Sequence, residues 1–206
     1  MPIEHRLWLV AALAFSAFLA LGSVVTRRGL GRVDVESGSW RGTSTALAAV
    51  FTLSGRSLPL LVAGILSLAL SVLFHRNLYT PLFIFASQLA SQGAVELFKH
   101  LFRRTRPDDW LLHHELGFSY PSGHATTAIV FFGAWAIACT LMPIAPPLKA
   151  VLVVGLLFWA FGIDWSRMAL SAHYFTDVLG GTLFGIAWLC LMGSLIWRYL
   201  PGVLRV

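Results

Sequence analysis

Uncharged apolar runs of membrane-spanning length dominate this sequence. Several runs of about 18–20 residues contain no charged side chain, and a helix of that length crosses the hydrocarbon core of a bilayer, which is about 30 Å thick. Apolar residues make up 57% of the chain and charged residues 12%, whereas soluble domains have about 25% charged residues. The chain is therefore predicted to be an integral membrane protein of the all-α class.

The uncharged runs predict a bundle of six transmembrane helices, which forms one domain over residues 1–206. The runs lack the period-2 alternation of strands, and the first exceeds the roughly 7–15 apolar residues of a signal peptide, so we expect it to be retained. The six predicted helices are Leu7–Val25, Leu58–Phe74, Asn77–Phe98, Ala125–Met142, Lys149–Asp164 and Asp177–Trp197.

Three connections are predicted to share one side of the membrane, namely residues 26–57, 99–123 and 164–176. The first contains Thr45–Leu53, which is apolar but too short to span, so we expect it to lie at the interface or to pack against the helices. Because the connections share a side, motifs that are distant in the sequence can form one site.

The net charge of +6 does not indicate a nucleic-acid-binding protein. The basic residues lie in short connections, where they would meet lipid headgroups or an anionic substrate. Cys139 and Cys190 fall inside apolar runs, which is typical of buried free cysteines. No cysteine spacing indicates a zinc site, and we expect no cofactor.

The first polar cluster contains Lys99, Arg106 and Pro107. A spacing of seven places Lys99 and Arg106 on one helical stripe, about 10 Å apart along the axis. Pro107 disfavours helix at the residue before it, so Arg106 is expected at the helix end. Two cations there suit phosphate oxygens, although basic side chains also snorkel to membrane interfaces. Arg103 and Arg104 are interpreted as that ordinary case.

The second cluster is Pro121-Ser122-Gly123-His124, directly before the fourth predicted helix. Ser122 is a natural N-cap, and Gly123 allows the backbone to approach a ligand. The free N–H groups and the helix dipole favour a bound anion, beside which His124 would serve as an acid. An ordinary helix cap with a solvent-facing histidine is the alternative.

The third cluster contains Ser166, Arg167, His173 and Asp177. His173 and Asp177 are four residues apart, so they are predicted to share a helix face. A carboxylate that accepts a hydrogen bond from one imidazole nitrogen leaves the other free to attack. Arg167 can bind phosphate in bidentate fashion. The alternative is a histidine–aspartate pair that only satisfies two polar groups.

In this order the clusters read KxxxxxxRP, PSGH and SRxxxxxHxxxD, and the chain resembles the type 2 phosphatidic acid phosphatase superfamily over Lys99–Asp177. The resemblance implies that His173 is the nucleophile, Asp177 its orienting carboxylate and His124 the general acid. It also implies a phosphate cradle formed by Lys99, Arg106, Ser122, Gly123 and Arg167, without a metal.

The predicted function is hydrolysis of a terminal lipid phosphate through a phosphohistidine. Undecaprenyl diphosphate is the first choice of substrate, followed by phosphatidylglycerol phosphate and phosphatidic acid. Lipid phosphotransfer, as in lipid A modification, is a second enzymatic reading, and a vanadate-dependent haloperoxidase would share the cradle. A non-enzymatic lipid transporter is a third class, although it has little need of His173, Asp177 and His124 together.

The resemblance implies a bacterial-type cytoplasmic (inner) membrane, with the site facing the periplasm or exterior. The distribution of Lys and Arg favours the opposite orientation, since cytoplasmic loops are normally enriched in them. Ten of the 15 Lys and Arg residues lie on the site side, and removing the three expected phosphate ligands still leaves seven against five.

Several further polar residues carry weaker predictions. Glu96 lies three residues before Lys99, which predicts an ion pair, and Asp164 is predicted to hold Ser166 or Arg167. Gly181 and Gly185 predict close helix packing, for which a contact inside the bundle is favoured over a dimer interface. The run His113-His114-Glu115 is interpreted as a polar loop rather than a metal site, or as a contact to the headgroup beyond the phosphate.

Overall fold

A computed structural model describes residues 2–112 and 115–199, and within those ranges every regular element is a helix. The all-α prediction is confirmed. In chain order the helices are α1 (Ile3–Arg28), α2 (Arg32–Glu36), η1 (Ser37–Trp40), α3 (Thr45–Ser54), α4 (Ser57–Leu73), α5 (Tyr79–Phe102), α6 (Gly123–Thr127), the π-helical turn η2 (Ala128–Phe132), α7 (Gly133–Leu141), α8 (Pro146–Ala169) and α9 (Phe175–Tyr199).

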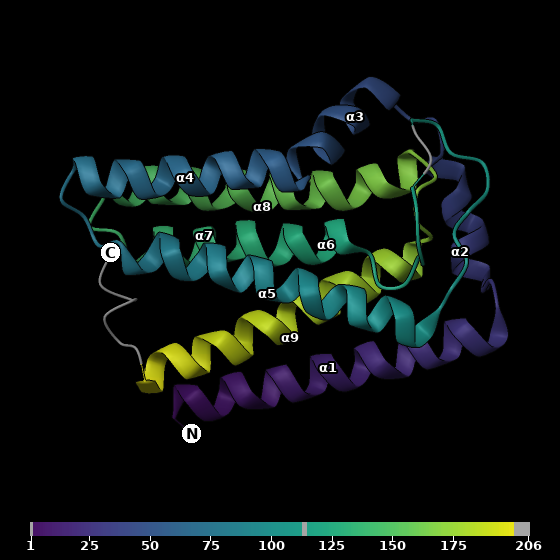
Figure 1. The fold of residues 1–206 in the computed structure, drawn as a ribbon, viewed down its shortest axis with the longest axis horizontal. Coiled ribbons are helices and arrows are strands. Elements are labelled where there is room, and N and C mark those ends of the chain that lie inside the picture. Colours follow the sequence, from purple (N-terminus) through teal and green to yellow (C-terminus); the bar gives the residue numbers. More distant parts are fainter. Residues whose placement is uncertain (1, 113–114, 200–206) are drawn as a thin grey trace.

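The six predicted helices correspond to α1, α4, α5, the continuous run α6–η2–α7, α8 and α9, which lie along one another in the bundle (Figure 1). The largest error is at the fifth helix, because α8 extends to Ala169 rather than ending at Asp164. The last turns of α8 carry buried polar side chains with partners elsewhere in the protein, so a charged residue does not end this helix.

Length and hydropathy qualify four of these segments as candidate membrane spans: α1, the run Gly123–Leu141, α8 and α9. The pair α3 and α4, bent by 52° at Gly55 and Arg56, would make a fifth span. Helix α5 has 24 residues but is not among them. Its apolar surface is interrupted by Gln88, Gln92 and Lys99, which line the cavity described below.

The outer surface of the bundle is apolar. Leu58, Val151 and Phe158 are 70%, 68% and 65% exposed, and a soluble protein rarely presents a continuous apolar surface of this kind. These side chains suit contact with lipid tails. The protein is an integral membrane protein with several spanning helices.

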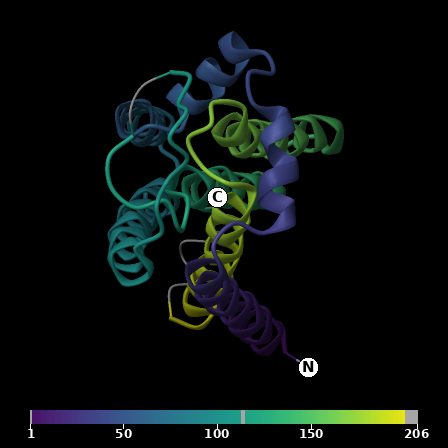
Figure 2. The ribbon, with the colours of Figure 1, turned by 90° about the vertical axis from the view of Figure 1, so that its right-hand side faces the viewer.

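The three longer connections meet at one end of the bundle, as predicted (Figure 1). The first turn of α1 and the last turn of α9 lie at the opposite end. Seen from the end that carries the connections, α4 and α5 lie on the opposite side from α8 (Figure 2).

The segment between α1 and α4 packs against the bundle. Its helix α3 lies on α8, where a Cβ at Gly162 would come within 2.3 Å of the Phe51 ring. Of the two placements predicted for Thr45–Leu53, the membrane interface or packing against the helices, the structure shows the packing. Helices α2 and η1 lie near the N-terminal end of α9 and the C-terminal end of α8.

Glycines allow the loop before α6 to enter the bundle. Tyr120 is fully buried and donates a hydrogen bond from its hydroxyl to the Phe18 carbonyl (2.6 Å). Cβ atoms at Gly22 and Gly180 would lie 2.7 and 2.3 Å from its ring. The chain between Tyr120 and α6 is thus held between α1 and α9.

The predicted close packing at Gly181 and Gly185 is also confirmed. A Cβ at Gly181 would lie 2.4 Å from the Ser122 carbonyl oxygen, and one at Gly185 would lie 2.8 Å from Cβ of Ile129. Small residues at such contacts allow membrane helices to approach closely. The contact lies inside the bundle and positions α9 beside the start of α6.

Candidate active site

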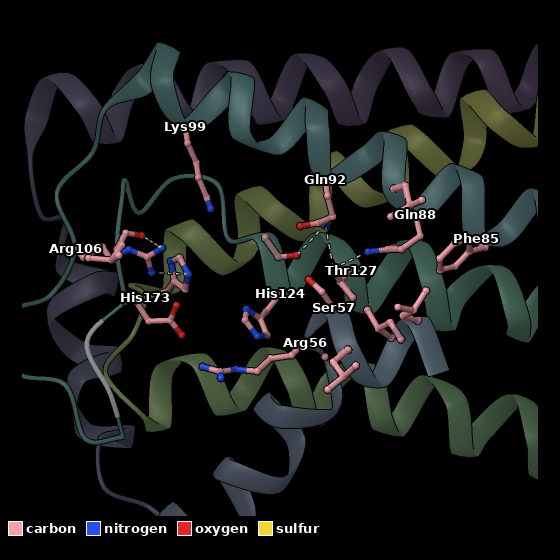
Figure 3. A pocket seen from close by; sticks show the side chains of 18 residues that line it. Arg56, Ser57, Phe85, Gln88, Gln92, Lys99, Arg106, His124, Thr127 and His173 are labelled. Carbon is pink, nitrogen blue, oxygen red and sulfur yellow. Dashed lines mark hydrogen bonds between the residues drawn. The ribbon is translucent and has the colours of Figure 1, made fainter. Parts of the chain in front are cut away.

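A cavity of about 590 Å³ opens at the end of the bundle that carries the connections. Five predicted site residues line it: Lys99, Arg106, Gly123, His124 and His173. Figure 3 shows Lys99, Arg106 and His173 at one end and Phe85 at the other, with His124 between them. The remaining lining residues are Gly55, Arg56, Ser57, Leu58, Leu60, Leu61, Gln88, Leu89, Gln92, Glu115, Leu116 and Thr127.

Lys99 and Arg106 reach the cavity from different kinds of structure. The prediction that both lie on one helical stripe is wrong, because α5 ends at Phe102 and Arg103 adopts a left-handed conformation (φ 52°). Arg106 belongs to the following loop. Its guanidinium group donates to the carbonyl oxygens of Gly117 (3.1 Å), Leu116 (3.2 Å) and Ala172 (3.1 Å).

The predicted pair between Glu96 and Lys99 is confirmed, with 2.6 Å between the Lys99 Nζ and a Glu96 carboxylate oxygen. The Lys99 side chain is only 12% exposed, whereas that of Glu96 is 60% exposed. The more exposed Glu96 carboxylate therefore fixes the position of the less exposed Lys99 ammonium group.

The turn before α6 has the predicted cap. The Ser122 hydroxyl oxygen accepts a hydrogen bond from the Ala125 N–H at 3.4 Å, which satisfies one free donor of the helix start. The Ser122 N–H donates to the Asp177 carbonyl oxygen (3.0 Å). Ser122 is fully buried and does not line the cavity, whereas Gly123 does. The hydrogen bond from Ser122 to Asp177 thus connects the turn before α6 to α9.

His124 lies in the first turn of α6 and borders the cavity. Its Nε2 atom makes no hydrogen bond to the described part of the chain. Its ring rests on Gly55, where a Cβ would lie 3.2 Å from its Cδ2 atom. This buried ring nitrogen is therefore left without a hydrogen-bond partner among the described residues.

His173 makes contacts that define its tautomer. Its Nε2 atom lies 3.1 Å from the Arg106 guanidinium Nη1, and a guanidinium group can only donate. Nε2 is therefore the unprotonated nitrogen, and the proton resides on Nδ1. The Nδ1 atom lies 3.2 Å from the Ser119 hydroxyl oxygen. The ring thus has its lone pair toward the cavity cations and its N–H toward the interior.

Asp177 lies close to His173, but the predicted shared helix face is wrong. His173 precedes α9, which begins at Phe175, and the Nδ1 atom lies 3.7 Å from the nearer carboxylate oxygen. Ser119 donates to that same oxygen at 2.5 Å and so connects the two side chains. The Tyr174 N–H also donates to it (2.9 Å). Ser119 was not singled out by any sequence pattern.

Arg167 is fully buried behind the cavity rather than in its wall. It donates to the Thr52 hydroxyl oxygen and, at 2.7 Å, to the Glu115 carboxylate. Burial alone would raise the pKa of Glu115, but the adjacent Arg167 and Arg106 lower it to about 2. An anionic oxygen of the protein therefore lies on Arg167.

Burial and charge keep the His173 ring neutral. Burial lowers the pKa of His173 well below its ordinary value of 6.5, and the positive charges of Arg106, Arg167 and Lys99 lower it further. Glu115 acts in the opposite direction but does not reverse the effect. A neutral imidazole is the form that can attack phosphorus.

Arg104 was interpreted as an interfacial side chain, and this interpretation is wrong. Its side chain is only 5% exposed and contacts the carboxylates of Asp34 and Asp177. Arg103, by contrast, is exposed and donates to the His100 carbonyl oxygen (3.0 Å). Arg104 and Asp34 are residues of the site region that the sequence did not reveal.

Asp164 also differs from its prediction. It accepts a hydrogen bond from the Thr182 hydroxyl (3.1 Å), while Ser166 donates to the Ile163 carbonyl oxygen. Asp164 therefore connects α8 to α9 and does not hold Ser166. His113 and His114 of the loop lie outside the described residues. Within those residues, no three His, Cys, Asp or Glu side chains cluster as metal ligands would.

A family model described as the PAP2 superfamily matches residues 80–200, which is more than half of the chain. The chain belongs to the PAP2 superfamily. The matched region begins with α5 and ends after α9, so it contains all three motifs. The resemblance noted from the motifs is confirmed.

Curated relatives and a solved structure agree with this assignment. The chain is 38% identical over 98 residues to the phosphatidylglycerophosphatase B of Haemophilus influenzae, which is 44% of this chain and 37% of the relative. It is 36% identical over 121 residues to a candidate undecaprenyl-diphosphatase of Escherichia coli, covering 54% of this chain and 56% of the relative. The chain thus spans less than two thirds of the length of these curated relatives.

The fold is similar to that of a transmembrane PAP2-type phosphatidylglycerolphosphate phosphatase from Bacillus subtilis. The TM-score is 0.77, with 24% identity, and the match covers 92% of this chain and 96% of the other. The two proteins therefore share a fold that includes the motif-free N-terminal helices of this chain.

Proposed function

We propose that this protein is a membrane lipid phosphatase that removes a terminal phosphate through a phosphohistidine at His173. The observation that supports this most strongly is the tautomer of His173. Its Nε2 lone pair faces the cavity cation Arg106, while its Nδ1 proton faces Ser119 and, behind it, Asp177. A nucleophilic imidazole needs this arrangement.

In the first step, the His173 Nε2 lone pair attacks phosphorus and the bond to the leaving oxygen breaks. His124, which takes up a proton when the anionic substrate binds, gives that proton to the leaving oxygen, so the dephosphorylated lipid leaves as an alcohol or a shorter phosphate. Arg106 transfers its hydrogen bond from His173 to a phosphate oxygen, which frees the lone pair. Positioning and neutralisation of charge supply most of the catalysis in phosphoryl transfer.

In the second step, water attacks the phosphohistidine and His124 takes a proton from that water. The bond between phosphorus and Nε2 breaks, and inorganic phosphate leaves. His124 can serve in both steps because its Nε2 atom has no hydrogen-bond partner in the described chain. His173 returns to the tautomer with its proton on Nδ1.

The proposed phosphate cradle contains Lys99, Arg106, Arg167, Ser122 and Gly123. Three cations would neutralise the oxygen charge that a divalent metal neutralises in many other phosphoryl-transfer enzymes, so the reaction is proposed to need no metal. Arg167 would exchange its contact with Glu115 for a phosphate oxygen.

Arg56 supports a substrate with a second phosphate. It lines the cavity at the break between α3 and α4, and Figure 3 shows it across the cavity from Lys99. None of the three motifs contains it. A further cation would suit undecaprenyl diphosphate, our first choice, or phosphatidylglycerol phosphate, both of which carry a second phosphate. Phosphatidic acid carries only one.

The other end of the cavity suits a lipid tail. Leu58, Leu61, Phe85 and Leu89 line it from α4 and α5, and the outer surface of both helices is apolar and exposed. We propose that the tail lies against these two helices while the headgroup reaches His173. A substrate in the bilayer would then approach sideways.

We propose that the site faces the exterior of a bacterial cytoplasmic membrane, with the first turn of α1 and the last turn of α9 toward the cytoplasm. Arg104 is buried between two carboxylates, and removing it from the seven remaining basic residues leaves six against five, which weakens the charge count that favours the opposite orientation. A reporter fused after Val206 tests this: activity of a cytoplasmic reporter agrees with the proposal, and activity of an exported one contradicts it.

Phosphate release by the purified protein in detergent with EDTA tests the proposed function. The panel contains undecaprenyl diphosphate, phosphatidylglycerol phosphate and phosphatidic acid, with His173→Ala as the control. We expect release in EDTA that is lost in the variant. Metal-dependent release that survives His173→Ala would show that the site assignment is wrong.

The role of Arg56 is tested on the same panel with Arg56→Gln. We expect kcat/KM to fall about tenfold for the two substrates with a second phosphate, because one charge-assisted hydrogen bond contributes roughly 1.5–3 kcal/mol. Phosphatidic acid should be hydrolysed within about twofold of the unmodified rate. An equal loss on all three lipids would contradict a selective role.

A further inference from the structure

A buried ionic network joins the motif-free N-terminal part of the chain to the proposed nucleophile. Arg104 donates to Asp34 at 2.7 Å and to Asp177 at 2.6 Å. Asp34 and Arg104 are 4% and 5% exposed, and Asp177 is fully buried. The three residues come from α2, from the loop after α5 and from α9.

The contacts use the planar fork of the guanidinium group. Its Nη2 atom binds Asp34, whereas its Nη1 atom binds both Asp177 Oδ1 and the Thr176 hydroxyl oxygen (2.6 Å). Asp34 in turn accepts hydrogen bonds from the Thr176 N–H (2.9 Å) and hydroxyl (2.8 Å). The guanidinium carbon also lies 4.6 Å from the centre of the Tyr174 ring. A lysine could not reproduce this geometry, since it has a single nitrogen.

The network fixes the rotation of the Asp177 carboxylate. Its Oδ1 atom is occupied by Arg104, which leaves Oδ2 for Ser119 and the Tyr174 N–H. Ser119 is also the contact of His173 Nδ1. The position of the His173 ring therefore depends on Arg104 through two intermediate side chains.

The charges of the network suit the proposed reaction. Two carboxylates and one guanidinium group give a net charge of −1 beside a neutral imidazole. When Nε2 bonds to phosphorus and Nδ1 keeps its proton, the ring becomes cationic. The network then provides a compensating charge in a buried region, where such charges interact strongly.

We propose that Asp34 and Arg104 are positioning residues that hold Asp177 and His173 in the geometry needed for phosphoryl transfer, so that the segment between α1 and α3 acts on the proposed reaction. This inference rests on the proposed function. It assigns a role to a part of the chain that carries none of the three motifs.

The test compares Arg104→Gln, Arg104→Lys and Asp34→Asn with Arg103→Gln, an adjacent exposed arginine, as the matched control. We expect Arg104→Gln to lower kcat about 10²-fold, the scale of a small misplacement of a reacting group. KM and the inhibition constant of inorganic phosphate should change less than about threefold, because Arg106 and Lys99 remain in the cavity. Arg104→Lys should recover only part of kcat, and the control should match the unmodified protein.

The combined Asp34→Asn and Arg104→Gln variant distinguishes one unit from two independent contacts. Residues that act as a unit give non-additive effects, so the double variant should lose little more than Arg104→Gln alone. Losses that multiply would overturn the inference. Asp34→Asn, which is nearly isosteric, provides the same kcat readout if Arg104→Gln does not fold.

A merely structural brace would lower the thermal stability of the variants but leave kcat of the folded fraction unchanged, and this result would also overturn the inference. The proposed function fails separately. If His173→Ala keeps turnover, the function is wrong. If His173→Ala is inactive while the Arg104 and Asp34 variants keep normal kcat, only the positioning role is wrong.

Discussion

Arg104 and Arg106 are two residues apart in one loop, yet they belong to different regions. Arg106 lines the cavity wall together with Lys99, His124 and His173. Arg104 belongs to the layer behind that wall, where it lies between two buried carboxylates. In the proposed reaction, a cation in the cavity wall exchanges a hydrogen bond within the protein for one to the phosphate. In the layer behind, Arg104 contacts groups of the protein, and these contacts fix geometry.

This difference predicts different kinetic effects. Changes in the cavity wall should alter phosphate binding and chemistry together. Changes at Arg104 and Asp34 in the layer behind should alter kcat or stability while phosphate binding stays the same. The following predictions test the division, in order of decreasing effect.

Arg106→Gln should have the largest effect. Removing one donor from a site that stabilises developing negative charge costs about 10²–10³ in rate, and we expect a loss of this size in kcat/KM together with weaker inhibition by inorganic phosphate. Arg104→Gln should leave that inhibition unchanged. Steady-state kinetics of both variants measure this, and the division would be wrong if the two arginines gave the same pattern.

Glu115→Gln should strengthen inhibition by inorganic phosphate about tenfold, because Arg167 would lose its charged partner and a charge-assisted hydrogen bond is worth roughly 1.5–3 kcal/mol. The pKa of Glu115 is about 2, so the competing carboxylate is ionised throughout the working range. Once the inhibition is corrected for the ionisation of inorganic phosphate, the difference between the variant and the unmodified protein should therefore show no titration of Glu115 between pH 5 and 8. Unchanged inhibition would mean that Arg167 does not bind phosphate.

Gly181→Ala tests the close helix packing behind the cavity wall, and Gly155→Ala is its matched control. A Cβ at Gly181 would lie 2.4 Å from the Ser122 carbonyl oxygen, whereas one at Gly155 has nothing within 4 Å. We expect Gly181→Ala to cost about 1–3 kcal/mol of stability through overpacking. Gly155→Ala should be neutral or slightly stabilising. Thermal unfolding in detergent measures both, and equal melting temperatures would contradict the close contact.

The smallest expected effect is that of pH on His173. Its pKa is lowered by burial and by Arg106, Arg167 and Lys99, with Glu115 opposing. A lowered pKa keeps the imidazole neutral at pH 6.5, so kcat/KM should not fall as the pH decreases from 8 to 6.5, while protonation of the general acid His124 over this range can only raise it. The profile is corrected for ionisation of the substrate phosphate. A loss of activity centred near pH 6.5 would show an unshifted histidine.

The sequence predicted the parts of the fold that local patterns determine. Uncharged runs located the six long helices, Ser122 was recognised as an N-cap, and the three-residue spacing of Glu96 and Lys99 predicted their ion pair. Each depends on neighbours in the chain, which periodicity and capping rules describe.

The missed features depend on residues far apart in the sequence. Asp34 and Arg104 are separated by 70 residues, and Ser119 and Asp177 by 58. No local pattern distinguishes a buried arginine with two carboxylate partners from one at a membrane interface. Arg106 was misplaced for a different reason, since α5 ends at Phe102 rather than at the residue before Pro107.

A rapid-quench experiment with a ³²P-labelled substrate tests the central claim most directly. The reaction is stopped in alkali, in which phosphohistidine survives, and the labelled peptide is mapped. The account predicts label on His173 in the unmodified protein, none in His173→Ala, and slower loss of label in His124→Ala. Label on another residue, or full turnover by His173→Ala, would contradict it.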